Sequence, residues 1–198
     1  MYRITYLLAL LVALPAAGLE LTPGAIMLPA DATAAERHAA AELADHFKRI
    51  AGTEFPITNA APSAGTTIRL RRDPALAAEQ YRLQASPETR QLILTGGRPR
   101  GLLYGVYGLL ADHFGCRWFT PEVAQLPRRA RLTLPDALDE TRAPRFEYRE
   151  VFWTEAFDGD WAARNRLNSS HARLLPHHGG KICYGPFVHT FDRILPVE

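Results

Sequence analysis

Two segments have the hydrophobic spacing of helices that bury one face. The first begins with a capping box at residues 33–36 and has Gly52 in place to end it. Its apolar positions recur at intervals of three and four residues: Ala40, Leu43, Phe47 and Ile50. This spacing predicts an amphipathic helix, with Glu42 among the polar residues off the buried face.

The second helix is expected to follow the glycine-rich turn 96–101 and to run to about His113. One face of it carries Gly101, Gly105 and Gly108. Each interior glycine costs about 1 kcal/mol relative to alanine, so this stripe predicts a helix whose backbone packs closely on a sheet. The turn has neither the spacing nor the Lys-Ser/Thr pair of a phosphate-binding loop, which favours a tight strand-to-helix turn.

Short apolar or alternating runs predict strands at residues 21–28, 55–58, 68–71, 81–84, 92–94, 117–119 and 131–134. Two helices interleaved with these strands predict an α/β (α+β) two-layer sandwich, with both helices on a mixed sheet. We expect this domain to span residues 19–137.

The pattern changes after Pro135. Residues 136–144 are polar and acidic and are typical of a linker, residues 147–152 are a strand candidate, and residues 160–167 are a helix candidate. We expect residues 138–198 to form the linker and the truncated start of a (β/α)8 barrel, because a closed barrel takes about 250 residues.

The N-terminus has the pattern of an export signal. One basic residue, Arg3, precedes an apolar run at 4–14, and Pro15 and the small residues 16–18 follow. The run is shorter than the roughly 20 residues that span a bilayer. We therefore predict a signal peptide at residues 1–18, cleaved after Gly18, and a secreted or periplasmic protein with no membrane span in the mature chain.

The composition of the chain excludes some classes of binding partner but does not identify one. The formal net charge is +2, and 47% of the residues are hydrophobic, which is ordinary for a folded protein. The basic residues form no stripe, so a nucleic-acid partner is not expected. The two cysteines, Cys116 and Cys183, lack metal-site spacing, and two free thiols are favoured over a disulfide.

Candidate catalytic and metal-binding groups lack recognisable patterns. His171, His177, His178, His189 and Cys183 invite a zinc hypothesis, but no ligand spacing supports it, so neither a metal nor another cofactor is expected. The acidic residues of the same region are Glu150, Glu155, Asp158 and Asp160. No two of them form a recognisable acid and nucleophile pair for glycoside hydrolysis, and a Gly-x-Ser-x-Gly elbow is missing. We therefore assign no catalytic residue to this chain.

Polar side chains beside aromatic ones are typical of sugar-binding surfaces. Four residues of the C-terminal part fit that description: Arg149, Trp153, Asn165 and His189. They are the predicted substrate-binding residues, and an oligosaccharide or polysaccharide is the predicted partner.

Longer motifs resemble known families. Residues 94–107, Leu-Thr-Gly-Gly-Arg-Pro-Arg-Gly-Leu-Leu-Tyr-Gly-Val-Tyr, resemble the end of the non-catalytic N-terminal domain of family 20 hexosaminidases and family 67 α-glucuronidases. Residues 114–121, 146–151 and 161–168 resemble secreted bacterial proteins that carry the domain of unknown function 4838. In these proteins, a sandwich precedes a barrel.

The resemblance implies a role for Arg149. Residues 144–149, Pro-Arg-Phe-Glu-Tyr-Arg, look like the entry to the first barrel strand of hexosaminidases, where the second arginine binds sugar hydroxyls. Glu150 stands where those enzymes have glycine, which leaves the identity of the sugar open.

The resemblance therefore implies the N-terminal portion of a secreted glycoside-hydrolase-like protein of carbohydrate metabolism, with the catalytic carboxylates outside this chain. The chain alone is then expected to be inactive, although the intact protein would be a glycoside hydrolase. The alternatives are a non-catalytic exported glycan-binding module and an isolated structural domain. The oligomeric state stays open.

Overall fold

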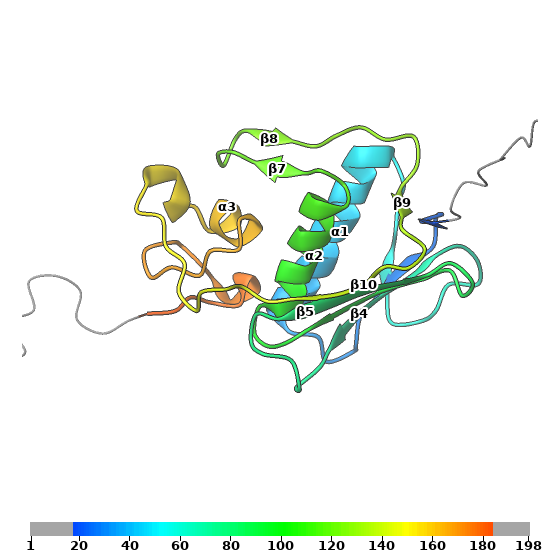
Figure 1. Cartoon of the computed structure of the whole chain (residues 1–198), viewed down its shortest axis with the longest axis horizontal. Helices are drawn as coiled ribbons and strands as arrows, with labels where there is room; N and C mark the ends of the chain where they lie inside the picture. The colour runs from blue at the N-terminus through cyan, green and yellow to red at the C-terminus, as the bar shows by residue number, and fades with distance from the viewer. Residues whose placement is uncertain (1–17, 184–198) are drawn as a thin grey trace, which may run out of the picture.

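The computed structural model describes residues 18–183, in which two helices lie on one face of a mixed sheet and a C-terminal segment lies beside them (Figure 1). The predicted signal peptide, except Gly18, and the predicted contact residue His189 lie outside the described residues. None of the helices within residues 18–183 is both long and apolar enough to cross a membrane.

The sheet has six strands in the order β10-β5-β6-β4-β2-β3. Their bounds are Ala25–Met27 (β2), Ile57–Thr58 (β3), Thr67–Arg72 (β4), Tyr81–Ser86 (β5), Gln91–Gly96 (β6) and Asp139–Arg142 (β10). Strand β2 pairs in parallel with β3 and β4, and β4 pairs in parallel with β6, whereas β5 runs antiparallel to both β6 and β10. The predicted mixed sheet is confirmed.

Helix α1, Ala34–Ala51, forms where the sequence predicts it. Thr33 and Glu36 make the reciprocal capping box: the Thr33 hydroxyl accepts from the Glu36 N–H, and the Glu36 carboxylate accepts from the Thr33 N–H. Gly52 ends the helix in the left-handed conformation, at φ 69°. The four predicted apolar residues of this helix are all buried.

Helix α2, Gly101–Asp112, packs its glycine face closely on strand β5. A β-carbon at Gly101 would overlap the carbonyl oxygen of Gln80, and one at Gly108 would overlap the hydroxyl of Tyr81. At Gly105 it would lie 3.2 Å from Cβ of Tyr81. The close approach predicted from the three glycines is confirmed.

The glycine-rich turn before α2 is a structural turn, as predicted. The N–H of Gly97 donates to the carbonyl of Gln80 at 2.9 Å, and the N–H of Gly101 donates to the carbonyl of Ala78 at 3.0 Å. These backbone donors are already satisfied within the protein, so they do not form a phosphate cradle.

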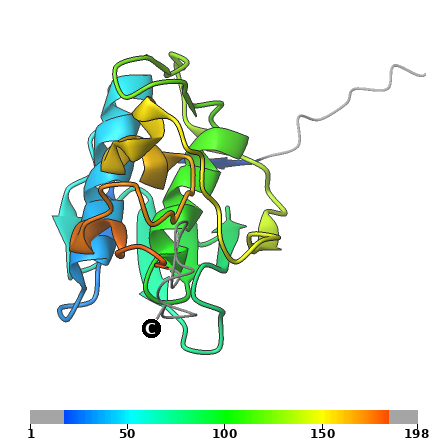
Figure 2. The ribbon, with the colours of Figure 1, turned by 90° about the vertical axis from the view of Figure 1, so that its left-hand side faces the viewer.

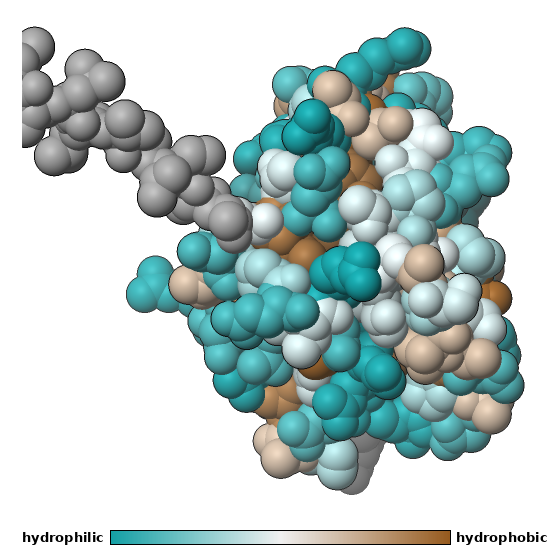
Figure 3. Space-filling view, turned by 90° about the vertical axis from the view of Figure 1, so that its right-hand side faces the viewer, coloured by the Kyte–Doolittle hydropathy of each residue, from teal (hydrophilic) through white to brown (hydrophobic). Residues whose placement is uncertain are grey.

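Two short strand pairs complete the sandwich: β1 (Leu19–Glu20) with β9 (Thr133–Leu134), and β7 (Arg117–Trp118) with β8 (Ala124–Gln125). Of the predicted strand 21–28, only Ala25–Met27 (β2) forms a strand, and β1 lies just before the predicted range. Figure 3 shows the face of the molecule remote from the C-terminal segment, where hydrophilic side chains predominate and apolar ones are scattered.

Three sequence predictions are wrong in detail. The expected linker contains strand β10, and residues 147–152 do not form a strand. Instead of pairing with a neighbouring strand, the backbone N–H of Arg149 donates to Oδ1 of Asn168 at 2.9 Å. Glu42, expected on the polar face of α1, is buried because it faces the C-terminal segment.

That segment contains the short helix α3, Gly159–Arg164, within the region predicted as helical, and two 3-10 turns, η1 (Thr154–Phe157) and η2 (Pro176–His178). Four of its buried residues belong to the same core as the sandwich: Ala162, Ala163, Ala172 and Leu174. Cys116 is buried and Cys183 is exposed, and both are free thiols as favoured from the sequence.

Candidate functional site

The C-terminal segment crosses the helical layer, and the junction between them gathers most of the buried polar groups. Figure 2 shows α3 (yellow) and η2 (orange) in front of α1 (blue) and α2 (green). Helix α3 contacts α2, and η2 contacts α1. The side chains that join the two parts are therefore the place to look for a site.

Glu79, just before β5, is the centre of one polar cluster. Its Oε1 accepts from Nε of Arg100 at 2.8 Å and from Nδ2 of Asn168 at 2.9 Å, and its Oε2 lies 2.6 Å from Nη2 of Arg149. The side chains of Glu79 and Arg149 are only 11% and 16% exposed. The Glu79 carboxylate thus forms ion pairs with two guanidinium groups in an environment from which water is largely excluded.

Arg149, the main sequence-predicted contact residue, is fully occupied in this cluster. Besides Glu79, its guanidinium donates to the carbonyls of Arg166 at 2.8 Å and Phe146 at 2.7 Å. The guanidinium carbon lies 5.6 Å from the centre of the Tyr104 ring, within cation–π range. The Tyr104 hydroxyl in turn donates to the Leu167 carbonyl at 2.9 Å.

A cleft of about 350 Å³ opens beside this cluster. Its lining residues are Tyr81, Tyr104, Arg142, Ala143, Pro144, Arg149, Asn165 and Arg166. Two of the predicted contact residues, Arg149 and Asn165, therefore lie together at this cleft. Trp153 is not part of the lining and is 65% exposed.

A second buried cluster surrounds Glu42. Two guanidinium nitrogens of Arg164 donate to the Glu42 carboxylate, Nε at 3.0 Å and Nη2 at 3.1 Å. The hydroxyl of Tyr107 also donates to this carboxylate, at 3.1 Å. Burial alone would raise the pKa of Glu42, but the hydrogen bond and charge of Arg164 outweigh it and lower that pKa. Glu42 is therefore held ionised and joins α1 to α3. No sequence signal marks this pair, because its members are 122 positions apart.

Three of the four carboxylates considered for glycoside hydrolysis have other contacts, whereas the buried Oε2 of Glu155 has no hydrogen-bond partner among the described residues. Asp158 caps α3 by accepting from the Trp161 N–H at 2.8 Å. Glu150 lies 2.6 Å from Nδ1 of His171, and Asp160 lies 2.7 Å from a ring nitrogen of His178. These contacts are those of a helix cap and of carboxylate–histidine hydrogen bonds.

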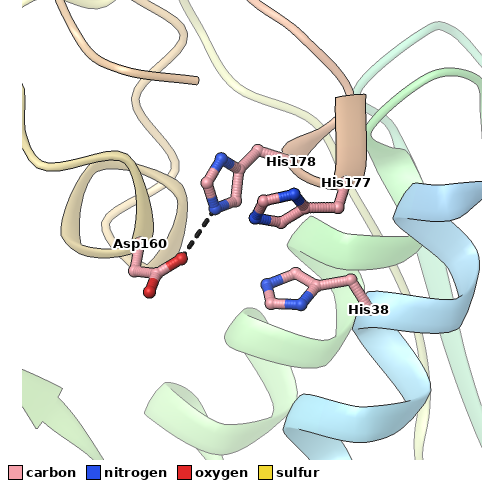
Figure 4. A group of neighbouring side chains, drawn as sticks. All are labelled: His38, Asp160, His177 and His178. Carbon is pink, nitrogen blue, oxygen red and sulfur yellow. Dashed lines mark hydrogen bonds and ion pairs between the residues drawn. The ribbon is translucent and has the colours of Figure 1, made fainter. Parts of the chain in front are cut away.

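Within residues 18–183, one group of side chains could hold a metal ion. His38 of α1, Asp160 of α3, and His177 and His178 of η2 have donor atoms that all lie within 4.8 Å of one another (Figure 4). Burial lowers the pKa of both His38 and His178. The sequence offered two of these histidines as candidates, but His38 is a lone histidine in a helix, and only the fold brings it to them.

Two family profiles match the chain in succession. The profile "Glycosyl hydrolase family 20, domain 2" matches residues 13–111, half of the chain, and "Domain of unknown function (DUF4838)" matches residues 118–198. The first match ends in the last turn of α2, and the second match begins at β7. The resemblance indicated by the sequence motifs is confirmed.

Several solved structures resemble the chain at low sequence identity. A mutant Streptomyces plicatus beta-hexosaminidase in complex with its product GlcNAc is 22% identical over 77% of this chain and 30% of that chain, with a TM-score of 0.52. The beta-N-acetylhexosaminidase of Streptomyces coelicolor A3(2) is 19% identical over 78% and 32%, with a TM-score of 0.48. A family GH115 4-O-methyl-alpha-glucuronidase with specificity for decorated arabinogalactans is 14% identical over 64% and 18%, also at 0.48.

The chain spans less than a third of the length of each of these enzymes. Among proteins of curated function, none matches it in sequence. The match to the S. plicatus enzyme shows a shared mixed α/β fold.

Proposed function

The chain belongs to the glycosyl hydrolase family 20, domain 2, family, and on this premise we propose that it is the N-terminal portion of a secreted glycoside-hydrolase-like protein of carbohydrate metabolism. The observation that carries the proposal is the order of the two matched families, a family 20 sandwich domain followed by the DUF4838 region. The sandwich then serves as a non-catalytic support on which the following domain packs.

The proposed organisation has three parts: a signal peptide at 1–18, the sandwich at 19–137, and the start of a (β/α)8 barrel within 138–198. Strand β10 adds the beginning of the third part to the edge of the sandwich sheet. Exposed apolar side chains near the junction support a larger second domain. Phe146, Val151, Phe152 and Trp153 are 44–73% exposed within eight consecutive residues. Such a concentration is typical of a surface that another part of a protein covers.

We assign no catalytic carboxylate to this chain. Three of the acidic candidates in the C-terminal segment are engaged in a helix cap or in hydrogen bonds with histidine. The chain should therefore release no sugar by itself. In the intact protein, an acid and a nucleophile or base would lie on barrel strands outside this chain.

Substrate contacts are proposed at Arg149, Trp153, Asn165 and His189. The cleft supports the first and third of these by position, since Arg149 and Asn165 both line it, and arginine donors suit hydroxyl or carboxylate groups. The same cleft supports the alternative function, a non-catalytic glycan-binding module. Arg142, whose side chain is 50% exposed, is the donor most accessible to such a ligand.

One experiment separates these functions. The purified chain is incubated with a panel of 4-nitrophenyl glycosides and is also applied to a glycan array. Neither hydrolysis nor binding is expected for a supporting domain. Binding that Arg142→Ala abolishes, and that Arg131→Ala on the exposed surface leaves intact, would favour the glycan-binding module instead. Release of nitrophenol by the purified chain would overturn the proposal.

The proposed signal peptide and secretion can be tested separately. When the whole chain is expressed in a bacterium, we expect a periplasmic or secreted product whose intact mass lacks residues 1–18. A product that stays in the cytoplasm and retains its first 18 residues would contradict the proposed secretion.

A further inference from the structure

Three imidazoles and a carboxylate from distant parts of the chain surround one small space where η2 packs on α1 (Figure 4). They are His38, Asp160, His177 and His178, with donor atoms within 4.8 Å of one another. Imidazole nitrogen and carboxylate oxygen are the usual ligands of zinc and of other divalent transition metals. The family matches say nothing of a metal at this place.

The environment of the His38 ring independently indicates a ligand at this position. Its Nε2 is buried and has no hydrogen-bond partner among the described residues. Its ring lies edge-on to both histidines of η2, at 4.9 Å from the His177 ring and 5.5 Å from the His178 ring. An unpaired buried nitrogen is unfavourable, and a cation would satisfy it.

His178 is held in one tautomer. The N–H of Leu175 donates to its Nδ1 at 3.1 Å, so the proton of the neutral ring is on Nε2. That proton is donated to Oδ1 of Asp160, at 2.7 Å. Both ring nitrogens are therefore used, and His178 orients the Asp160 carboxylate while Oδ2 stays available to a ligand.

Gly159 makes this arrangement possible. A β-carbon at this position would lie 2.8 Å from Cε1 of His178 and would overlap the carbonyl of Arg173. The first residue of α3 must therefore lack a side chain if the His178 ring is to reach Asp160.

We propose that His38, His177 and Asp160 bind one divalent transition-metal cation, with zinc as the best-suited metal and with His178 as a positioning residue. Tetrahedral zinc places its donor atoms about 3.3 Å apart, so the side chains must close by about 1–1.5 Å, which rotation of the half-buried His177 and the exposed Asp160 allows. Water completes the coordination.

The proposed cation joins α1 of the sandwich to α3 and η2 of the C-terminal segment. Its role is that of a clamp across the junction, and it is independent of whether the protein is a glycosidase. Without a cation, the three rings would only pack on one another, with the His177 and His178 centroids 4.0 Å apart.

The test uses the full chain without a histidine tag and with the exposed thiol removed by Cys183→Ser. After treatment with EDTA, the protein is titrated with ZnCl2 by calorimetry and with CoCl2 by visible absorption. We expect one equivalent of zinc to bind with a Kd of about 10 µM or tighter. The Co²⁺ complex should have d–d bands and no thiolate charge-transfer band.

Variants locate the site. His38→Ala and His177→Ala should weaken zinc binding about 100-fold or more, and His178→Gln about 10–100-fold, the usual cost of losing a partner of a metal ligand. His113→Gln, a control on the far end of α2, should bind as the parent protein does. Zinc should also raise the Tm of the parent and of the control, but not that of His38→Ala.

Two results would overturn the proposal: zinc binding no tighter than about 1 mM, or equal binding by all variants, which would place the metal on other histidines. Circular dichroism of each metal-free variant checks that it folds. If His38→Ala does not fold, His38→Gln replaces the ring with an amide of similar size, and Asp160→Asn removes the carboxylate from an exposed position.

Discussion

Nη2 of Arg149 lies 2.6 Å from Oε2 of Glu79, and this ion pair connects the C-terminal segment to the sandwich. Glu79 belongs to the approach to β5, and Arg149 follows β10, so the pair joins positions 70 residues apart. Because Glu79 also binds Arg100, it neutralises two cations in a place from which water is largely excluded. The family resemblance implies a sugar contact for Arg149, and the fold gives it a second role as a support of the junction.

Removal of Glu79 should therefore destabilise the protein more than removal of Arg149. Glu79→Ala leaves two buried guanidinium groups without their anion, and we expect it to lower the free energy of unfolding by about 3–5 kcal/mol. Arg149→Ala leaves Glu79 paired with Arg100 and should cost about 2–3 kcal/mol. Urea unfolding followed by circular dichroism measures both.

The double variant and a surface pair test whether this interaction is direct. In a double-mutant cycle, Glu79 and Arg149 should couple by about 1–3 kcal/mol. The pair Glu20–Arg131, at 3.5 Å and with side chains 45% and 72% exposed, should couple by less than about 1 kcal/mol. Additive effects of Glu79→Ala and Arg149→Ala would show that the two side chains stabilise the fold separately.

Arg164 should control how firmly the C-terminal segment is held. Arg164→Leu keeps an apolar side chain but removes the guanidinium group, so the buried carboxylate of Glu42 is left with the Tyr107 hydroxyl alone. We expect proteinase K to cleave the segment at least tenfold faster in this variant, because breaking a buried pair costs about 3–5 kcal/mol. Mass spectrometry of the products over time measures the rate.

The matched control is Arg173→Leu, which removes an exposed arginine from the same segment. It should be digested at the rate of the parent protein. If Arg164→Leu is as resistant as the control, the segment is held by its apolar contacts and not by this ion pair.

Helix α1 could be predicted almost to the residue because its signals are local. The capping box of Thr33, the spacing of the apolar positions and the terminal Gly52 all lie within one stretch of sequence. The glycines of α2 gave equally local information, since only close packing explains three of them on one face.

Strand β10 and the junction could not be predicted in this way. Every residue of β10 is polar, and its place at the sheet edge depends on distant partners: Asp139 binds Arg82 at 2.7 Å, and Glu140 lies 2.9 Å from His113. Arg149 could be identified from its aromatic neighbours and from a family motif, but neither signal predicts its ion pair. Its partner Glu79 lies in an irregular approach to β5 that has no distinguishing pattern.

The glycines of α2 should tolerate alanine in a graded order. Replacing glycine by alanine favours the helix by about 1 kcal/mol. Whether each variant is more or less stable than the parent therefore depends on the space available for the new methyl group. At Gly101 the new methyl group would meet backbone, and the free energy of unfolding should fall by more than about 3 kcal/mol. At Gly108 it would displace the Tyr81 hydroxyl, at a net cost of about 1–2 kcal/mol.

Gly105→Ala serves as the internal control of this series. Its methyl group would lie 3.2–3.4 Å from the Tyr81 side chain, a contact that small shifts relieve, so the net change should be within about 1 kcal/mol of zero. Thermal unfolding of the three variants measures the order. A Gly101→Ala variant as stable as the parent would contradict the close packing of α2 on β5.

His46 should make the protein less stable in mild acid. It is completely buried, and its Nδ1 donates to the Glu42 carbonyl at 2.7 Å, whereas its Nε2 has no partner among the described residues. Burial lowers the pKa of His46 below the ordinary value of 6.5, despite the opposing charge of Glu42 and with a small contribution from Arg164 in the same direction. A second proton would enter a site that offers no acceptor for it.

The direction of this pH effect follows from the difference in proton binding between the folded and the unfolded chain. Above pH 6.5 the ring is neutral in both the folded and the unfolded chain, and the stability is complete. As the pH falls below 6.5, the unfolded chain binds the proton first, so the free energy of unfolding decreases, by at most about 2 kcal/mol at pH 5. Urea unfolding at pH 5, 6, 7 and 8 measures this loss. His46→Asn retains a donor near Nδ1 but cannot titrate, so its stability should decline less over the same range; equal declines in the parent and the variant would assign the acid sensitivity to other groups.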